Sequence, residues 1–260
     1  MTRDEEITEV QLLSLWGKTK DRDPKSPLFH PLLFHLMDVG NAARALWELL
    51  PRRMQERIAD ALGLSVANAE RVVVLLAGVH DLRKASAFQT KADYCWANVR
   101  RAGFDLRYPA DEPHAFVTAN VGVLPRLLQQ TTACGWAVTE QKLAVTLASI
   151  TGAHHGKFPA RNSMSEATLG GARWARAREM LAERLAEALY PGSVGNPVRL
   201  AGAALTDVGV GAVLAGLIAV ADWVGSTVGV WNRGYTPLFA LEPGKSLAEY
   251  TRSSEERAEK

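Results

Sequence analysis

The stretch ERVVVLLAGVHDLRK, residues 70–84, decides the fold class of this chain. It is rich in β-branched residues, but its apolar run continues without the alternation or the hairpin turns of strands. We therefore predict one helix over residues 70–84, apolar nearly all round as in the middle of a helical bundle. The polar pair His80 and Asp81 follows this apolar run, where burial is costly unless another group satisfies it. A metal ion would do so, and a hydrogen-bonded pair at a helix end is the simpler alternative.

The remaining periodic segments also predict helices, and strand signals are scarce. Residues 32–50 have apolar side chains at helical spacing, begin after Pro31 and stop before Pro51. Further helices are predicted over residues 118–130 with a break near Pro125, 139–151, 171–189 and 213–224. The sequence therefore predicts an all-α helical bundle with few or no strands.

A nearly uncharged stretch, residues 200–231, has the composition of a membrane span. Asp207 and Asp222 interrupt it, and the fourteen residues between them fall short of the roughly 20 that a spanning helix needs. Six glycines from Gly202 to Gly229 lower its helix propensity further. We interpret the stretch as a central core helix, with a membrane span as the lesser alternative.

The overall composition is typical of a folded soluble protein. A formal charge of +2, from 30 basic and 28 acidic side chains, gives no bulk signature of nucleic-acid or membrane binding, so any phosphate binding must be local. Cys95 and Cys134 share no CxxC spacing, which argues against a disulfide framework and against a thiolate zinc site. The N-terminal MTRDEEITEV lacks the basic start and apolar stretch of a secretory signal. We expect a cytoplasmic protein with no membrane partner.

All six histidines lie between residues 30 and 155. His35 precedes Asp38 by about one helical turn, a spacing that suits a metal ligand with a carboxylate neighbour. A core histidine hydrogen-bonded to Asp38 is an equally good interpretation of the local sequence. His30 precedes a proline, and we expect it to support the site or the fold rather than to bind an ion.

A second group of histidines lies further along the chain. His154 and His155 follow Gly152 and precede Gly156, where an apolar helix runs out, so both rings could converge on one ion. His114, in DEPHAFVTAN, fits the first turn of a helix, where an isolated histidine is more often a surface or capping residue. The adjacent pair is therefore the more informative of the two signals.

Asp222 places a carboxylate inside the most apolar helix, where an uncompensated charge is expensive. A metal ion is the favoured compensation, and a buried cation or a hydrogen bond from Trp223 or Ser226 is the alternative. The candidate ligands are His35, His80, Asp81, His114, His154, His155 and Asp222.

Imidazole and carboxylate ligands without sulfur favour manganese, iron, nickel, cobalt or magnesium over a structural zinc cage. These seven ligands are too many for one open ion, but they fit two divalent ions that share a bridging Asp81.

In this order the ligands resemble those of the HD nuclease domain at the N-terminus of the CRISPR-associated helicase-nuclease of type I systems. The resemblance covers residues 12–235 and implies an HD-domain helical bundle over residues 1–240, with 241–260 starting a linker or helix toward a helicase domain. Five motifs carry it: LWGKTK at 15–20, HPLLFHLMDVGNAA at 30–43, HDLRKASAFQ at 80–89, GAHHGKFP at 152–159 and LIAVADWVGS at 217–226.

The resemblance also implies the ligand sets and the reaction. Lys84 matches the family's lysine near the scissile phosphate, and Ser226 matches a residue beside the last ligand. Family members cut single-stranded DNA, receive it from a fused or separate helicase, and are recruited by an RNA-guided surveillance complex. Asp81 would hold the two ions together while water attacks the phosphodiester. One ion would be held by His35, His80, Asp81 and Asp222, and the other by Asp81, His114, His154 and His155.

The path of the DNA has two candidate sets of contacts. Lys157 and Arg161 follow the histidine pair, and Arg173 and Arg176 flank Trp174 on the next helix, where charge and stacking would combine. A solvated helix face is the simpler interpretation of these arginines. Two other functions fit the ligand pattern less well: a nucleotide phosphohydrolase of the same superfamily, and a metal-free HD domain that binds a protein partner.

Overall fold

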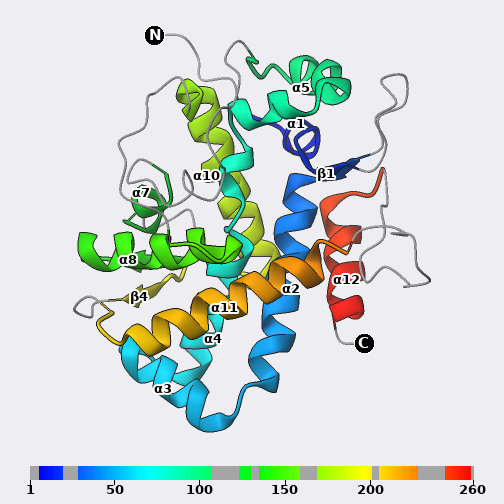
Figure 1. The fold of residues 1–260 in the computed structure, drawn as a ribbon. Helices are drawn as coiled ribbons and strands as arrows, with labels where there is room; N and C mark the ends of the chain where they lie inside the picture. The colour runs from blue at the N-terminus through cyan, green and yellow to red at the C-terminus, as the bar shows by residue number, and fades with distance from the viewer. Residues whose placement is uncertain are drawn as a thin grey trace.

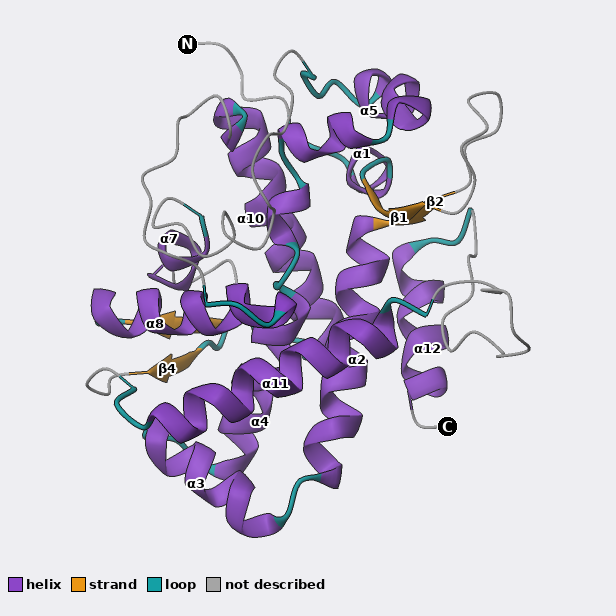
Figure 2. Ribbon diagram, in the orientation of Figure 1, coloured by secondary structure: helices purple, strands orange, loops and turns teal. Residues whose placement is uncertain are grey.

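Helices dominate the computed structural model, which describes residues 6–19, 29–106, 123–129, 135–158, 169–200, 205–227 and 244–258 (Figures 1 and 2). The α-helices are α1 (Glu9–Leu13), α2 (Leu32–Leu49), α3 (Arg52–Leu62), α4 (Val66–Gly78), α5 (Trp96–Arg101), α7 (Leu124–Gln129), α8 (Gln141–Gly152), α10 (Gly171–Leu189), α11 (Val208–Gly225) and α12 (Leu247–Ala258). The 3-10 helices are η1 (Leu82–Lys84), η2 (Ala87–Lys91), η3 (Asp93–Cys95) and η4 (Ala153–His155). The strands are β1 (Trp16–Thr19), β2 (Phe29–Pro31), β3 (Trp136–Val138) and β4 (Val198–Leu200).

The strands form only two small sheets in the described part of the chain. β1 pairs antiparallel with β2, and β3 pairs parallel with β4 (Figure 2). The predicted all-α bundle with few strands is therefore confirmed.

Most helices predicted from hydrophobic periodicity are present. α2 and α10 match the predicted ranges 32–50 and 171–189 to within one residue, and α8 lies within two residues of 139–151. α11 begins before residue 213, because Asp207 Oδ1 accepts a hydrogen bond from the Val210 amide at 3.1 Å and caps the helix. α7 covers residues 124–129 of the predicted range 118–130, with Pro125 in its first turn. α3, directly after Pro51, was not predicted.

The predicted single helix over residues 70–84 is wrong at both ends. α4 begins earlier, where the side chain of Ser65 accepts a hydrogen bond from the Asn68 amide at 3.3 Å. It ends at Gly78, and the chain continues through a turn into η1. His80 Nδ1 lies 2.8 Å from the Ala77 carbonyl oxygen, which also accepts a hydrogen bond from the His80 amide at 3.2 Å. His80 and Asp81 therefore lie in a turn, not on a continuous helix.

α2 is the central helix of the bundle, and its residues from Leu32 to Ala43 are all buried. α4, α10, α11 and α12 pack against it, and the ribbon shows α11 crossing it (Figure 1). The helix that carries His35 therefore touches the helix that precedes His80 and the helix that carries Asp222.

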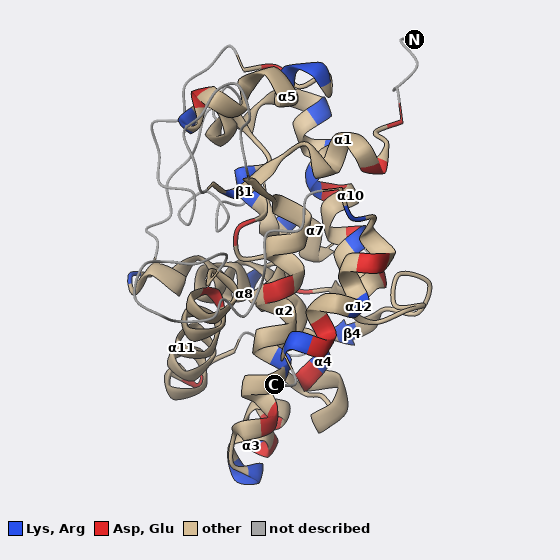
Figure 3. Ribbon diagram, turned by 90° about the vertical axis from the view of Figure 1, so that its right-hand side faces the viewer, with Lys and Arg blue, Asp and Glu red and all other residues tan. Residues whose placement is uncertain are grey.

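α11 is long and apolar enough to cross a membrane by length and composition, and α3 and α4 would pass the same test only as one span bent by 82°. Half of the α11 window is buried inside the fold, against α2, α8 and η4. The helix is almost bare of charge, while basic and acidic side chains are interspersed along α3, α10 and α12 (Figure 3). α11 therefore occupies the core position that the sequence predicted.

The close approach of α11 to α2 depends on Gly225. A Cβ at this position would lie 2.9 Å from the Val39 amide nitrogen and 3.0 Å from Val39 Cα, whereas a Cβ at Gly216 would meet nothing within 4 Å. We expect Gly225→Ala to lower the free energy of unfolding by about 1–3 kcal/mol, because backbone atoms cannot move aside cheaply. Gly216→Ala, on the same helix, is expected to raise it by about 0.5–1 kcal/mol through helix propensity. Urea unfolding of both variants tests this, and equal effects would contradict the packing argument.

The linker or helix expected over residues 241–260 contains α12, which packs against α2. Tyr250 is fully buried, and its ring stacks on Phe34 with centroids 3.8 Å apart and planes at 1°. Residues 228–243 lie outside the described residues, and the domain division at residue 240 stays a prediction. The end of the chain nevertheless contributes to the core around α2.

Candidate metal centre

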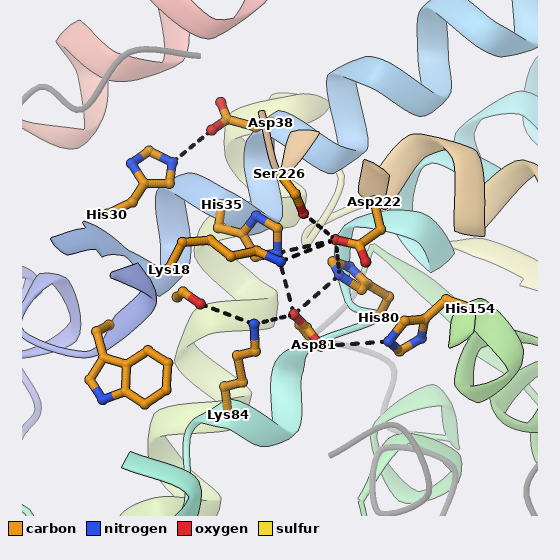
Figure 4. Close-up of polar contacts among 12 residues, drawn as sticks. Lys18, His30, His35, Asp38, His80, Asp81, Lys84, His154, Asp222 and Ser226 are labelled. Atoms are coloured by element: carbon orange, nitrogen blue, oxygen red, sulfur yellow. Dashed lines mark hydrogen bonds and ion pairs between the residues drawn. The ribbon is translucent and has the colours of Figure 1, made fainter. Parts of the chain in front are cut away.

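Four buried side chains from three separate segments meet beside the first turn of α2 (Figure 4). Their ligand atoms all lie within 4.8 Å of one another. α2 supplies one imidazole, the turn after α4 supplies a second imidazole and a carboxylate, and α11 supplies the other carboxylate. The four residues are His35, His80, Asp81 and Asp222.

The distances between these groups fit ligands around a shared ion. Asp81 Oδ2 lies 3.3 Å from the Nε2 atoms of both His35 and His80, and Asp222 Oδ1 lies 3.3 Å from His80 Nε2 and 3.6 Å from His35 Nε2. Ligand atoms about 2.1 Å from one ion, at octahedral or tetrahedral angles, are roughly 3.0–3.4 Å apart. Although two carboxylate oxygens are so close, His80 Nε2 makes no hydrogen bond within the described residues. A divalent cation would satisfy this buried nitrogen, so the residues fit a metal ion.

Backbone carbonyls fix the direction of two imidazoles. His80 Nδ1 lies 2.8 Å from the Ala77 oxygen, and His154 Nδ1 lies 2.8 Å from the Thr151 oxygen. A carbonyl oxygen can only accept, so each Nδ1 carries a proton, and each Nε2 is the ring nitrogen directed to the cluster. Metal-binding histidines in proteins are commonly oriented in this way.

Asp81 lies between two groups of histidines. Its Oδ2 faces His35 and His80, while its Oδ1 lies 3.7 Å from Nε2 of the buried His154. The exposed His155 follows on η4, with its ring centroid 4.3 Å from that of His154. His114 lies outside the described residues. The structure therefore brings His154 to the far side of Asp81, where the sequence predicted a second ion.

Two lysines balance the carboxylates. Lys84 Nζ lies 2.6 Å from Asp81 Oδ2 and donates to the Gly17 carbonyl at 3.0 Å, with only 5% of its side chain exposed. Lys84 is therefore enclosed, with Asp81 and the Gly17 carbonyl as its partners. Lys18 on β1, which the sequence did not single out, lies 3.6 Å from Asp222 Oδ1 with 30% of its side chain exposed. Its position within the LWGKTK motif is the feature of the sequence that could have indicated a place in the site.

Burial and charge set the protonation of the cluster. Burial disfavours charge on His80, but Asp81 and Asp222 raise its pKa to about 9. Burial and then the nearby Lys18 lower the pKa of His35 well below its usual value, and burial lowers the pKa of His154 to about 3. His35 and His154 are therefore neutral near pH 7 and ready to bind an ion. An ion that binds His80 must displace its proton.

Asp222 remains ionised although burial opposes its charge, because the neighbouring His80 lowers its pKa. Ser226 donates a hydrogen bond to Asp222 Oδ1 at 2.7 Å, and this bond was one of the alternatives to a metal ion offered by the sequence. Trp223, the other proposed donor, is 70% exposed. The cation beside Asp222 is Lys18, which is 30% exposed and so differs from the buried cation of the remaining alternative.

The predicted partnership of His35 with Asp38 is wrong. The Asp38 carboxylate lies away from the cluster (Figure 4), with Oδ2 2.7 Å from His30 Nε2 and with hydrogen bonds from Tyr250 and Ser254. Both His30 and Asp38 are fully buried. They therefore join α12 to α2 and do not orient His35 directly.

Of the candidate DNA contacts, those on α10 are engaged with other parts of the protein. Trp174 is 1% exposed and donates to the Asp105 carbonyl, so it cannot stack on a base, and Arg176 pairs with Glu179. Arg173 donates to the Ala102 carbonyl at 3.1 Å. The simpler interpretation of these arginines is therefore the better one. Lys157 is exposed two residues after His155, and Arg161 lies outside the described residues.

Comparisons with known proteins agree with this architecture. The family model for "Cas3, HD domain" matches residues 16–230. The CRISPR-associated endonuclease/helicase Cas3 of Thermus thermophilus is 32% identical over 243 residues, which cover 88% of this chain and 24% of that protein. The chain thus spans about a quarter of this curated relative.

Solved structures show the same fold. A crystal structure of a CRISPR-associated protein aligns with a TM-score of 0.73 and 28% identity over 97% of this chain and 26% of its own. The Thermus thermophilus cas3 HD domain, determined in the presence of Ni²⁺, aligns with a TM-score of 0.62 and 25% identity over 97% of this chain and 89% of its own. T. fusca Cas3 bound to AMPPNP, at 23% identity and a TM-score of 0.68, covers 95% of this chain and 26% of its own, and it supports the fold alone.

Proposed function

We propose that this chain, which belongs to the Cas3 HD domain family, is a metal-dependent nuclease acting in CRISPR interference. It would hydrolyse the phosphodiester bonds of single-stranded DNA. The observation that carries the proposal is the buried cluster of His35, His80, Asp81 and Asp222, spaced to hold an ion. The approach of His154 to the second oxygen of Asp81 supports two ions rather than one.

The chain's own residues would hold and orient the ions. His35, His80, Asp81 and Asp222 would hold one, and Asp81, His154, His155 and His114 the other. Divalent ions, when bound, supply Lewis acidity and lower the pKa of water. Lys84 keeps Asp81 in place from beneath, and the Ala77 and Thr151 carbonyls keep two imidazoles turned toward the centre. Imidazole and carboxylate ligands without sulfur suit manganese, iron, nickel, cobalt or magnesium.

Membership in the Cas3 HD domain family also supports proposals about partners and location. The Thermus relative is named an endonuclease/helicase, and a fold relative comes from a CRISPR RNA-guided surveillance complex. We propose that a helicase, fused or separate, supplies single-stranded DNA to this domain, and that a surveillance complex recruits it in the cytoplasm.

The proposal is tested by incubating the protein with circular single-stranded DNA and each of Mn²⁺, Co²⁺, Ni²⁺, Fe²⁺ and Mg²⁺. We expect cutting with at least one ion and none with chelator. Asp81→Ala is expected to slow cutting by about 10³-fold or more, since the carboxylate lies near His35 and His80 on one side and near His154 on the other. Asp60→Ala, an exposed carboxylate on α3, is the matched control and should cut like the parent.

Other outcomes would separate the alternatives. Cutting by Asp81→Ala at the parental rate would place the active site elsewhere. Turnover of free nucleotides without cutting of DNA would indicate a nucleotide phosphohydrolase, and protein that binds none of the five ions would indicate a metal-free interaction domain.

A further inference from the structure

Two lysines contact the carboxylates of the cluster, but only one of them faces solvent. Lys84 is enclosed and has both Asp81 and the Gly17 carbonyl as partners. The side chain of Lys18 is 30% exposed, and Asp222 is the one anion within ion-pair distance of it among the described residues. Figure 4 shows the Lys18 ammonium beside His35 and Asp222, and the Lys84 ammonium below it, beside Asp81. Lys18 is therefore the cation placed where a substrate could meet it.

The backbone of Lys18 is held firmly beside the cluster. The Trp16 amide donates to Gln89 Oε1 at 3.0 Å, and Gln89 Nε2 donates to the carbonyls of Trp16 and Lys84, each at 2.9 Å. A Cβ at Gly17 would lie 2.9 Å from Leu32 Cα and 3.0 Å from His35 Cβ, so the strand lies directly against the start of α2. The flexible side chain of Lys18 thus extends from a fixed strand, in contrast to a surface lysine on a loose loop.

The charges at Asp222 would change when the site is loaded. In the structure, the ammonium of Lys18 is one of the cations that neutralise this carboxylate. A divalent cation held by Asp222 would supply that charge itself and would repel the ammonium. A partly exposed lysine next to such a centre would then pair with the nearest anion that arrives from solvent, and for a nuclease this anion is a backbone phosphate.

We infer that Lys18 binds a phosphate of the DNA backbone beside the metal centre, exchanging its contact with Asp222 for the substrate. The inference rests on the proposed function and adds a substrate-binding residue to it. It assigns the two lysines different tasks: Lys84 positions Asp81, and Lys18 contacts the nucleic acid.

The experiment compares Lys18→Met with Lys142→Met in the full chain. Lys142 is exposed at the start of α8, while the histidine pair lies beyond the other end of that helix, so it is a matched charge control. The first readout is Mn²⁺ affinity without DNA, from the signal of free Mn²⁺ in electron paramagnetic resonance. The second is the affinity of the Mn²⁺-loaded protein for a fluorescent phosphorothioate oligonucleotide, which resists hydrolysis, followed by anisotropy over a range of salt concentrations.

Lys18→Met is expected to bind Mn²⁺ as tightly as the parent or up to about 10-fold more tightly, because a competing cation is gone. It is expected to bind the oligonucleotide about 5-fold to 10-fold more weakly, and the slope of log affinity against log salt should flatten by about 0.7, the loss of one phosphate contact on a single strand. Lys18→Arg should restore both the affinity and the slope, and Lys142→Met should change neither readout.

An unchanged oligonucleotide affinity and salt slope in Lys18→Met would overturn the inference. So would a parallel loss of Mn²⁺ and oligonucleotide binding, because that pattern indicates a structural role for Lys18. Either result, together with cutting that is lost in Asp81→Ala, would refute the role of Lys18 alone. Cutting that persists in Asp81→Ala would refute the proposed function itself.

Discussion

Asp222→Asn is expected to lower the affinity of the protein for Mn²⁺ by about 10²-fold to 10⁴-fold. The substitution keeps the shape of the side chain but removes the negative charge that lies 3.3 Å from His80 Nε2 and 3.6 Å from His35 Nε2. Loss of one partner from a buried set of charges costs roughly 3–5 kcal/mol, which corresponds to that range of affinity. Mn²⁺ titration followed by electron paramagnetic resonance, at constant pH, measures the effect.

Ser226→Ala provides the matched comparison for this variant. Ser226 donates to Asp222 Oδ1 at 2.7 Å, but its neutral hydroxyl cannot supply the negative charge of the carboxylate. Residues that only orient a metal ligand typically contribute about 10-fold to 100-fold in affinity, so we expect a loss in that lower range. Parental Mn²⁺ affinity in Asp222→Asn would show that the ion is not held by this cluster, whatever the result for Ser226→Ala.

The ligands of this centre could be found from the sequence because their local contexts are costly without a partner. Asp222 lies within an uncharged helix, and His80 and Asp81 follow an unbroken apolar run. At each of these positions the apolar neighbours predict burial, but the side chain itself is polar or charged. Because burying such a group alone is costly, the sequence indicates that it has a partner. The fold followed from the same apolar segments, since α2, α8 and α10 bury the faces that their periodicity predicts.

The errors occur where the deciding contact is distant in the sequence or is made by backbone. Asp38 is one helical turn from His35, yet its partners include Tyr250, more than two hundred residues away, which no local pattern could reveal. At the end of α4 the amide and the ring of His80 both bond to the Ala77 carbonyl, whereas the apolar sequence pattern continues past this point. The different exposure of Lys18 and Lys84 likewise depends on how β1 lies against α2, which is a tertiary property.

Tyr250→Ala is expected to lower the free energy of unfolding by about 3–5 kcal/mol, the usual cost of removing a large buried aromatic ring. The ring is fully buried against Phe34, and its hydroxyl lies 2.8 Å and 2.9 Å from the two oxygens of the buried Asp38. The variant therefore loses the stacking and leaves a carboxylate with fewer donors inside the core. Urea unfolding followed by tryptophan fluorescence measures the change.

Tyr250→Phe separates the two contributions. It keeps the ring on Phe34 but removes the hydroxyl, so we expect a loss of about 1–3 kcal/mol, the cost of taking a donor from a buried acceptor. The remaining donors, His30 at 2.7 Å and Ser254 at 2.7 Å, keep the loss below that of Tyr250→Ala. Glu256→Ala, an exposed position on the same helix, should change stability by less than about 0.5 kcal/mol. If Tyr250→Ala unfolds like this control, α12 is not part of the cooperative core, and the hydrogen bonds to Asp38 do not join it to α2.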